Sequence, residues 1–169
     1  MKYFEQFPTL VYNKYEVKNI ISKIKLADIL TEDLFSYANY TMETFDKPWT
    51  IAHDYYGTTD RTWLVFLSNN ILDPYYEWHM DQFNFEKYLS KKYGSVEASQ
   101  SNIEYYKNAD GVKYSIDTYT YADSALKNTL SPVYSYFRED EDNEAKRNIR
   151  LLRYDLAPIA ETNLKELLK

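Results

Sequence analysis

Two histidines are the residues best suited to chemistry in this sequence, and each has an aspartate close by. His53 directly precedes Asp54, and His79 lies two positions before Asp81. A histidine beside a carboxylate is typical of a general base with an orienting partner, or of part of a metal site. Neither spacing matches a ligand motif, and no third ligand is indicated. We therefore expect surface or packing roles for both histidines, with no metal and no cofactor.

A run of carboxylates, from Glu139 to Asp142, is the second group that could do chemistry. Such a run could bind a hard cation, but it lacks the glycine and the spaced oxygen ligands of a calcium loop. A solvated charged segment, or a contact with a basic partner, is the favoured interpretation. The sequence therefore predicts no metal site here.

No motif of a common enzyme active site is present. The glycine-rich phosphate-binding motifs and Gly-x-Ser-x-Gly are absent, and only 3 glycines are available to build such loops. The chain has no cysteine, which excludes disulfides, thiol nucleophiles and thiolate metal ligands. Two carboxylates at the correct separation could still hydrolyse a sugar, but among 26 acidic residues some pair is always available. We expect no enzyme.

Composition favours a globular protein that binds other proteins. A chain of 169 residues can form one domain with a substantial core, or a compact domain with an arm. The net charge of −6 disfavours a binder of phosphate backbones. The 19 tyrosines suit surfaces that are dry on one side and wet on the other, as interfaces commonly are. No apolar run has the length of a signal peptide or a membrane span, so we expect synthesis and assembly in a cytoplasm.

The clearest local signals predict two short helices after a strand at residues 40–45. Pro48 suits the first turn of a helix and Gly57 suits its left-handed end. A second helix is expected after Thr58 or Thr59, buried nearly all round, and ending near Asn70. Before these elements we expect an extended arm over residues 3–12 and a helix over residues 17–24, although the isoleucines there also suit a strand.

The rest of the chain is expected to alternate between helices and strands. Asp81 is expected to cap a helix that ends at Gly94, followed by an exposed polar linker over residues 95–102. A hairpin is predicted around Gly111, a strand at residues 149–153, and a final helix capped by Asp155. Residues 117–132 fit no single pattern. The fold class is therefore α+β, divided into an arm with a short helix (residues 1–36), a core with its following helix (37–94) and a C-terminal extension (95–169).

The aromatic residues divide into expected core and expected rim. Aromatic residues at helical spacing belong to a core more often than to a ligand platform, whereas those after a turn are expected to face outward. The core candidates are Trp49, Ile51, Tyr56, Gly57, Trp63, Phe66, Leu67 and Pro74. The candidates for a partner interface are Phe4, Phe7, Tyr75, Tyr76 and Trp78.

Residues 40–74 resemble the opening of a LysM module, a family whose members bind N-acetylglucosamine polymers such as peptidoglycan and chitin. The matching positions are Tyr40, Asp46, Trp49, Ile51, Ala52, Tyr56, Gly57, Trp63, Asn70, Asp73 and Pro74. The sequence departs from that family where the second strand should follow, and Phe45 stands where a glycine is usual. A LysM-like core is therefore implied, with its sugar-flanking loop in doubt.

A fuller resemblance extends along the whole chain. The combination IAHDYYG, TWLVFLSNNILDPYYEW and a helix ending KKYG, with FEQFPTLVY before it and NEAKRNIRLLRYDLAPIAETNLKELL at the end, is similar to a baseplate wedge protein of contractile-tailed bacteriophages. That resemblance implies a structural, non-enzymatic virion protein of the tail baseplate. Its implied partners are the other wedge subunits and the sheath-initiating and hub region, with one copy per wedge in a hexagonal ring that it holds together.

Two other functions stay open at this point. The alternative function is a wall-binding LysM-type module that takes peptidoglycan, either in a tail or in a cell-wall protein. The absent second strand, the single module and the lack of both an export signal and a hydrolase motif favour the structural function. An adaptor in a cellular contractile injection machine is not separable from the phage protein by sequence, because both share the baseplate plan.

Overall fold

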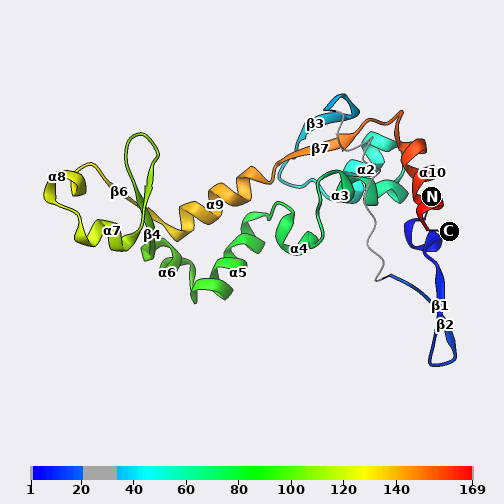
Figure 1. The fold of residues 1–169 in the computed structure, drawn as a ribbon, viewed down its shortest axis with the longest axis horizontal. Coiled ribbons are helices and arrows are strands. Elements are labelled where there is room, and N and C mark those ends of the chain that lie inside the picture. The colour runs from blue at the N-terminus through cyan, green and yellow to red at the C-terminus, as the bar shows by residue number, and fades with distance from the viewer. Residues whose placement is uncertain (1, 21–33, 169) are drawn as a thin grey trace. The chain divides into compact units, whose positions relative to one another are not determined.

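A computed structural model describes residues 2–20 and 34–168. The chain forms two compact units, unit 1 (Met1–Trp78 and Arg147–Lys169) and unit 2 (His79–Lys146). Both contain helices and small antiparallel sheets (Figure 1), so the predicted α+β class is confirmed. The three-part division at residues 36 and 94 stays a prediction. No helix in the described part of the chain has the length and apolar character needed to span a membrane.

Unit 1 is built on a two-stranded sheet whose strands are far apart in sequence. Strand β3 (Tyr37–Thr41) pairs antiparallel with β7 (Asn148–Leu152), with Tyr37 opposite Leu152. Between them in the chain come α2 (Pro48–Tyr56), the short 3-10 turn η3 (Thr59–Arg61) and α3 (Thr62–Ser68), all of which belong to the same unit. The strand after the second helix therefore comes from the chain beyond unit 2.

The two helices begin and end where their local signals predicted. Pro48 lies in the first turn of α2, and Gly57 ends it at φ 74°, with its N–H bonded to the His53 carbonyl. The Thr58 hydroxyl accepts a hydrogen bond from the Asp60 N–H and so caps the turn before α3. Asn70 follows α3 at φ 54°, a conformation that asparagine tolerates. The predictions for both helices are confirmed.

The hydrophobic core of unit 1 lies between this sheet, α2, α3 and α10 (Ala157–Leu167). Its buried members are Met42, Ile51, Ala52, Tyr56, Trp63, Leu64, Val65, Trp78, Ile149, Leu151, Leu152, Ala157, Ala160 and Leu164. The strand expected at 149–153 is confirmed as β7. Asp155 does not cap α10, because its carboxylate is paired with the Arg153 guanidinium at 2.7 Å, and Leu156 occupies the cap position.

The N-terminal residues form a hairpin, which differs from the expected arm and helix. A 3-10 turn, η1 (Tyr3–Gln6), precedes β1 (Thr9–Tyr12), which pairs with β2 (Tyr15–Lys18). Asn13 and Lys14 connect the strands with φ of 49° and 69°, the conformation of a tight hairpin turn. Val17 therefore lies in a strand and not in a helix, and the remainder of that expected helix, residues 21–24, lies outside the described residues.

Unit 2 contains a three-stranded sheet and several short helices. Its elements are α5 (Gln82–Tyr93), α6 (Val96–Ser101), β4 (Ile103–Lys107), β5 (Lys113–Tyr114), α7 (Ile116–Tyr121), α8 (Ser124–Lys127), β6 (Ser131–Tyr134) and α9 (Ser135–Ala145). Strand β4 pairs with both β5 and β6, and Gly111 in the loop has φ 80°. The helix capped by Asp81 and the hairpin around Gly111 are confirmed. Unit 1 adds η2 (Leu34–Ser36) and α4 (Pro74–Glu77).

One expectation for unit 2 was wrong, and a second was wrong for Glu139 only, since Glu141 and Asp142 of the acidic run are exposed. The polar linker at 95–102 contains α6, capped by the Ser95 hydroxyl and with Ser99 fully buried. The acidic run belongs to α9, where Glu139 is only 6% exposed. A polar composition did not indicate exposure in either case, because a serine cap starts a helix and a carboxylate with enough donors can be buried.

Candidate protein–protein interface

The β1–β2 hairpin carries an apolar face on one side of its two strands. Leu10 is directly opposite Val17, and Tyr12 is directly opposite Tyr15. Residues opposite each other in an antiparallel pair point to the same side, so these side chains share one face. The other face alternates with it and carries Thr9, Val11, Glu16 and Lys18. We refer to the first set as the hairpin face.

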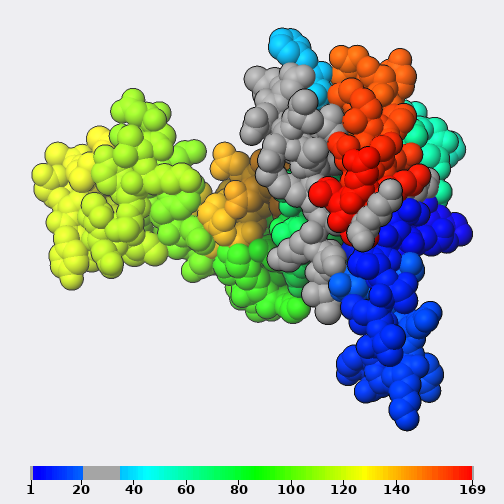
Figure 2. Space-filling model, turned by 45° about the vertical axis from the view of Figure 1, so that its right-hand side comes forward, coloured from blue at the N-terminus to red at the C-terminus, as the bar shows by residue number. Residues whose placement is uncertain are grey.

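All residues of both strands are exposed, and the hairpin stands out from the surface of unit 1 in Figure 2. Tyr12 is 66% exposed and Tyr15 is 74% exposed, while Leu10 and Val17 keep about two fifths of their surface in contact with solvent (40% and 38%). An isolated two-stranded hairpin is marginally stable in water. A contiguous apolar face on such an element indicates a binding surface.

The base of the hairpin is fixed to the core of unit 1 by aromatic stacking and by hydrogen bonds. The Tyr3 ring stacks on Trp63, with centroids 5.4 Å apart and planes 20° apart. Phe7 is 2% exposed and contacts Tyr3 edge to face at 5.0 Å. The Lys18 ammonium donates to the carbonyls of Glu5 at 3.0 Å and Phe7 at 2.9 Å. The exposed face therefore projects from an anchored base.

The predicted interface residues differ in where the structure places them. Phe4, Tyr75 and Tyr76 are exposed, at 60%, 85% and 48%. Phe7 and Trp78 are buried, so the outward orientation expected for both is corrected. Trp78 faces inward because its indole N–H donates to the Asp46 carbonyl at 3.3 Å and its ring meets Phe66 edge to face at 6.1 Å. Those partners lie up to 32 residues away, beyond the turn that suggested exposure.

The predicted core residues also separate into two groups. Ile51, Tyr56 and Trp63 are buried, Phe66 and Leu67 are half-buried, and Gly57 and Pro74 are exposed at the ends of helices. Trp49 is 56% exposed, contrary to its expected core position. The buried side of α2 carries Pro48, Ile51, Ala52 and Tyr56. At 100° per residue, Trp49 lies at the border of that buried side. It is in the first turn of α2, so no preceding turn of the helix shields it.

The sequence predicted a surface or packing role for each histidine: the His53 side chain is exposed, whereas the His79 side chain is only 5% exposed and has a partner other than Asp81. His53 Nδ1 lies 3.0 Å from the Asp54 carboxylate on an exposed site. His79 Nε2 lies 3.3 Å from Glu144, while Asp81 accepts from the Asn84 N–H at the start of α5. Residues 2–20 and 34–168 contain no group of three or more histidine and carboxylate side chains that could hold a metal ion.

The hairpin face could not be found from hydrophobicity alone, because both an arm and a helix fit the pattern. The available signal was Asn13, since asparagine tolerates positive φ, between two segments that alternate polar and apolar residues. The pairing of Leu10 with Val17 follows once Asn13 and Lys14 are taken as a two-residue turn. A hairpin prediction on that basis would have placed all the residues of the face together.

A comparison with known protein families bears directly on what such a surface serves. Residues 6–160 match a family model described as "Base plate wedge protein 53". The chain belongs to this family. The match covers β1, β2 and both units, so the whole described fold, apart from its first and last residues, is that of a baseplate wedge protein. The resemblance inferred from the sequence is confirmed at the level of the family.

A curated member of the baseplate wedge family gives the same result. The chain is 26% identical to "Baseplate wedge protein gp53" of Enterobacteria phage T4 over 172 aligned positions, which cover 88% of this chain and 87% of the relative. This chain is accordingly a structural component of a phage tail baseplate.

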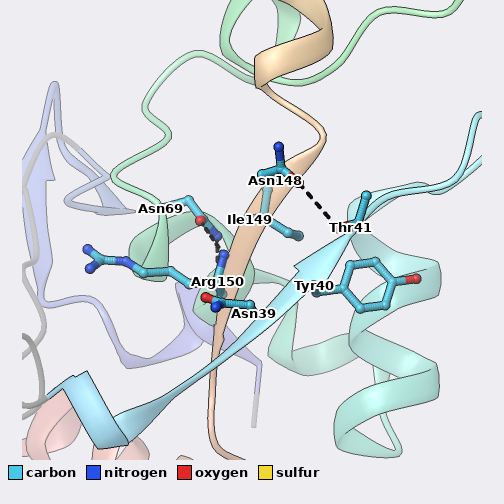
Figure 3. Close-up of a pocket in the computed structure, with 7 residues that line it drawn as sticks. All are labelled: Asn39, Tyr40, Thr41, Asn69, Asn148, Ile149 and Arg150. Carbon is cyan, nitrogen blue, oxygen red and sulfur yellow. Dashed lines mark hydrogen bonds between the residues drawn. The ribbon is translucent and has the colours of Figure 1, made fainter.

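The sheet of this wedge protein has one edge covered by side chains. The Asn69 amide donates to the Arg150 carbonyl at 2.8 Å and accepts from the Arg150 N–H at 2.9 Å, as Figure 3 shows. The Tyr56 hydroxyl donates to the Leu152 carbonyl at 2.8 Å, and burial raises the pKa of Tyr56 well above its usual range. These hydrogen bonds occupy the outer edge of β7 within the chain. The position of Asn69 at a helix end did not predict this role.

A second hydrogen-bonded network holds the turn between β3 and α2. The Asp46 carboxylate accepts from the Tyr40 hydroxyl at 2.9 Å and from the Glu43 N–H at 2.8 Å. Burial, followed by the hydrogen bond to Asp46, raises the pKa of Tyr40 to about 12. Tyr40 is therefore protonated in the physiological range and can donate to Asp46.

Proposed function

We propose that this chain is a non-enzymatic subunit that connects neighbouring wedges of the baseplate, and that it does so through the hairpin face. The proposal rests on one observation, the apolar face formed by Leu10, Tyr12, Tyr15 and Val17 on a hairpin whose base is anchored to the core. The family supplies the setting, a phage baseplate. The exposed apolar face of the hairpin is the surface that we propose to contact a partner in the baseplate.

The size of the face supports a contact between large assemblies and not a stable pair of free proteins. Each aromatic side chain buries about 150–250 Å² when it is fully covered, so two tyrosines and two partly exposed aliphatic residues provide about 400 Å². A stable interface between two proteins buries about 800 Å² on each side. A wedge subunit that is already held in its own wedge can use the smaller contact, because its position is fixed by other interactions.

The partners we propose are the other wedge subunits and the sheath-initiating and hub region, with one copy per wedge in a hexagonal ring. Assembly in the host cytoplasm and a final position in the virion accord with that role. Phe4, Tyr75 and Tyr76 are exposed aromatic residues that could extend the contact surface. No cofactor and no metal take part.

Substitution of the hairpin face tests this function. In phage carrying Leu10→Ser together with Val17→Ser, we expect wedges that contain the protein but fail to join into complete baseplates. The matched control is Val11→Ser, which removes an apolar side chain that is 72% exposed on the opposite face of the same hairpin. Complete baseplates from the double variant, observed by electron microscopy, would overturn the proposal. Loss of the protein from single wedges would instead assign the hairpin to assembly within a wedge.

A LysM-type sugar-binding module is the second candidate, supported by the order of β3, α2, α3 and β7. The antiparallel partner that was missing after the second helix is supplied by β7, and Trp49 is 56% exposed beside the turn at Asp46. Retention of the purified protein on insoluble peptidoglycan, lost on Trp49→Ala, would favour this candidate. Absence of retention would leave the structural function alone.

A further inference from the structure

The three-stranded sheet of unit 2 has two faces of different character. Tyr106 of β4 is opposite Tyr114 of β5, and its ring stacks on Tyr119 of α7, with centroids 3.7 Å apart and planes 4° apart. That face is therefore covered by α7 at this point. Successive residues of a strand point to opposite faces, so Tyr105 and Lys107, on either side of Tyr106, belong to the other face.

This other face brings two lysines directly opposite each other. Lys107 of β4 pairs with Lys113 of β5, and both side chains are exposed. Tyr105 is opposite Val133 of β6, and these two half-buried side chains form an apolar floor beside the lysines. The Lys113 ammonium lies 4.8 Å from the centroid of the Tyr105 ring. We refer to Tyr105, Lys107, Lys113 and Val133 as the lysine face.

The lysine pair has no carboxylate partner among the described residues. The acidic residue of β4, Glu104, is engaged elsewhere, because its carboxylate accepts from the Ser135 hydroxyl at 2.7 Å and lies 3.2 Å from the Arg138 guanidinium. Like charges directly opposite each other destabilise an antiparallel pair. A carboxylate placed between the two ammonium groups would remove that cost.

We propose that the lysine face binds an acidic segment of another protein of the baseplate. The partner segment is a helix with two carboxylates about one turn apart, beside an apolar side chain that lies on Tyr105 and Val133. Side chains at positions i and i+4 of a helix are about 5–6 Å apart at Cβ, and opposite residues of an antiparallel pair are about 4.5–5.5 Å apart. The two spacings match, so that each carboxylate meets one lysine.

Charge favours an acidic protein segment over a nucleic acid as the occupant. A protein that binds a phosphate backbone gains affinity by neutralising many phosphates, whereas this chain has a net charge of −6 and the lysine face offers two cations. Two lysines are enough to match a pair of carboxylates, and complementary charges suppress association with wrong partners. The lysine face belongs to unit 2 and the hairpin face to unit 1, so this inference goes beyond the proposed function.

Carbodiimide cross-linking of complete baseplates tests the contact. The reagent activates a carboxylate, and a lysine amine at ion-pair distance displaces the activating group to form an amide. We expect Lys107 and Lys113 to be joined to an aspartate or glutamate of a different baseplate protein, identified by mass spectrometry of the digested product. Lys107→Arg together with Lys113→Arg keeps both charges but removes both amines. This variant should assemble normally and lose these cross-links.

Charge reversal tests whether the contact matters for assembly. Lys107→Glu together with Lys113→Glu keeps two like charges opposite each other, so its melting temperature should stay close to that of the unmodified protein, but it repels an acidic partner. We expect the yield of complete baseplates to fall at least about tenfold. The matched control is Lys87→Glu with Lys91→Glu, the same change of charge at exposed positions of α5, which should assemble normally.

Three results would overturn the inference. The first is a charge-reversed variant that assembles as well as its α5 control. The second is the absence of cross-links from Lys107 and Lys113 when other lysines of the same baseplates are coupled. The third is coupling only to carboxylates of this chain, in the same or in a second copy, because the partner is then not another protein. None of these results changes the outcome expected for the hairpin face, whose variants are tested separately.

Discussion

Unit 1 and unit 2 exclude water with different kinds of side chain. The interior of unit 1 is an apolar cluster that includes Trp63, Leu64 and Leu151. The interior of unit 2 has fewer apolar members, Phe85 and Leu89 among them, and also buries Ser99, Ser135, Glu139 and Asn143. Unit 1 is therefore held mainly by hydrophobic burial, with the Arg61–Glu161 ion pair at its edge, whereas unit 2 depends more on a charged network.

Glu139 is the centre of that network. Its carboxylate accepts from the Lys92 ammonium at 2.7 Å, the Tyr93 hydroxyl at 2.8 Å and the Tyr88 hydroxyl at 3.1 Å, and it also pairs with Arg138. Burial alone would raise the pKa of Glu139, but the hydrogen bonds from Lys92 and Tyr93 outweigh it and lower that pKa. Four donors from α5 and α9 therefore hold one carboxylate in its ionised form.

The largest expected effect is a loss of stability in unit 1. Trp63→Ala removes a 6% exposed indole that stacks on Tyr3, and should reduce the free energy of unfolding by about 3–5 kcal/mol. Thermal unfolding followed by circular dichroism measures the loss. Trp49→Ala, on the exposed border of α2, is the matched control and should leave the melting temperature nearly unchanged. Equal effects of the two substitutions would mean that Trp63 does not belong to the core.

The next effect is confined to unit 2. Glu139→Ala leaves the Lys92 ammonium and the Tyr93 hydroxyl without their acceptor, and should cost about 2–3 kcal/mol in unit 2. Hydrogen exchange, read separately for amides of the two units, measures the change. Glu141 lies two positions after Glu139, on the exposed side of α9, and Glu141→Ala should have no comparable effect. Faster exchange throughout unit 1 after Glu139→Ala would contradict the separation of the two interiors.

Acid should distinguish the units without any substitution. The folded pKa of Glu139 is lowered, so its contribution to stability is complete above the usual pKa of a glutamate and is lost as the pH falls through the lowered folded value. The protection factors of amides in unit 2, which are corrected for the effect of pH on intrinsic exchange, should therefore fall on acidification before those of unit 1 do. The Glu139→Gln variant should lose this difference between the units. A parallel fall of protection factors in both units of the unmodified protein would argue against the network.

The smallest effect on stability is expected at the rim. Tyr75 is 85% exposed, and Tyr75→Ala should change the free energy of unfolding by less than about 0.5 kcal/mol. Trp78→Ala, three positions further on, removes a 7% exposed ring and should cost several times more. Denaturant titration of both variants measures the contrast. A large loss of stability for Tyr75→Ala would mean that the Tyr75 ring contributes to the core.

The parts of the fold that sequence predicted are those fixed by neighbouring residues. Pro48 and Gly57 determine α2 locally, and Asp81 determines the start of α5. The pairing of Thr41 with Asn148 joins residues 107 positions apart, and nothing near either residue indicates it. Trp78 was assigned outward for the same reason, since its contacts with Asp46 and Phe66 depend on how the chain returns.

The sequence predicted that the protein has an interface, but not which residues form it. The high tyrosine content indicated a surface that is partly shielded from solvent, but it does not say which tyrosine rings are buried. The hairpin face requires the register of β1 and β2, which depends on the turn at Asn13 and Lys14. Helix α6 carried a usable signal, Ser95 at the cap with Glu97 in the first turn, that its polar composition obscured.

Electron cryo-microscopy of complete baseplates is the measurement that tests the central claim most directly. The claim is that the hairpin face links one wedge to the next. We predict that Leu10, Tyr12, Tyr15 and Val17 lie buried against a chain of the adjacent wedge, with the base of the hairpin still packed on Trp63. A hairpin that remains in solvent, or that contacts only subunits of its own wedge, would contradict the account.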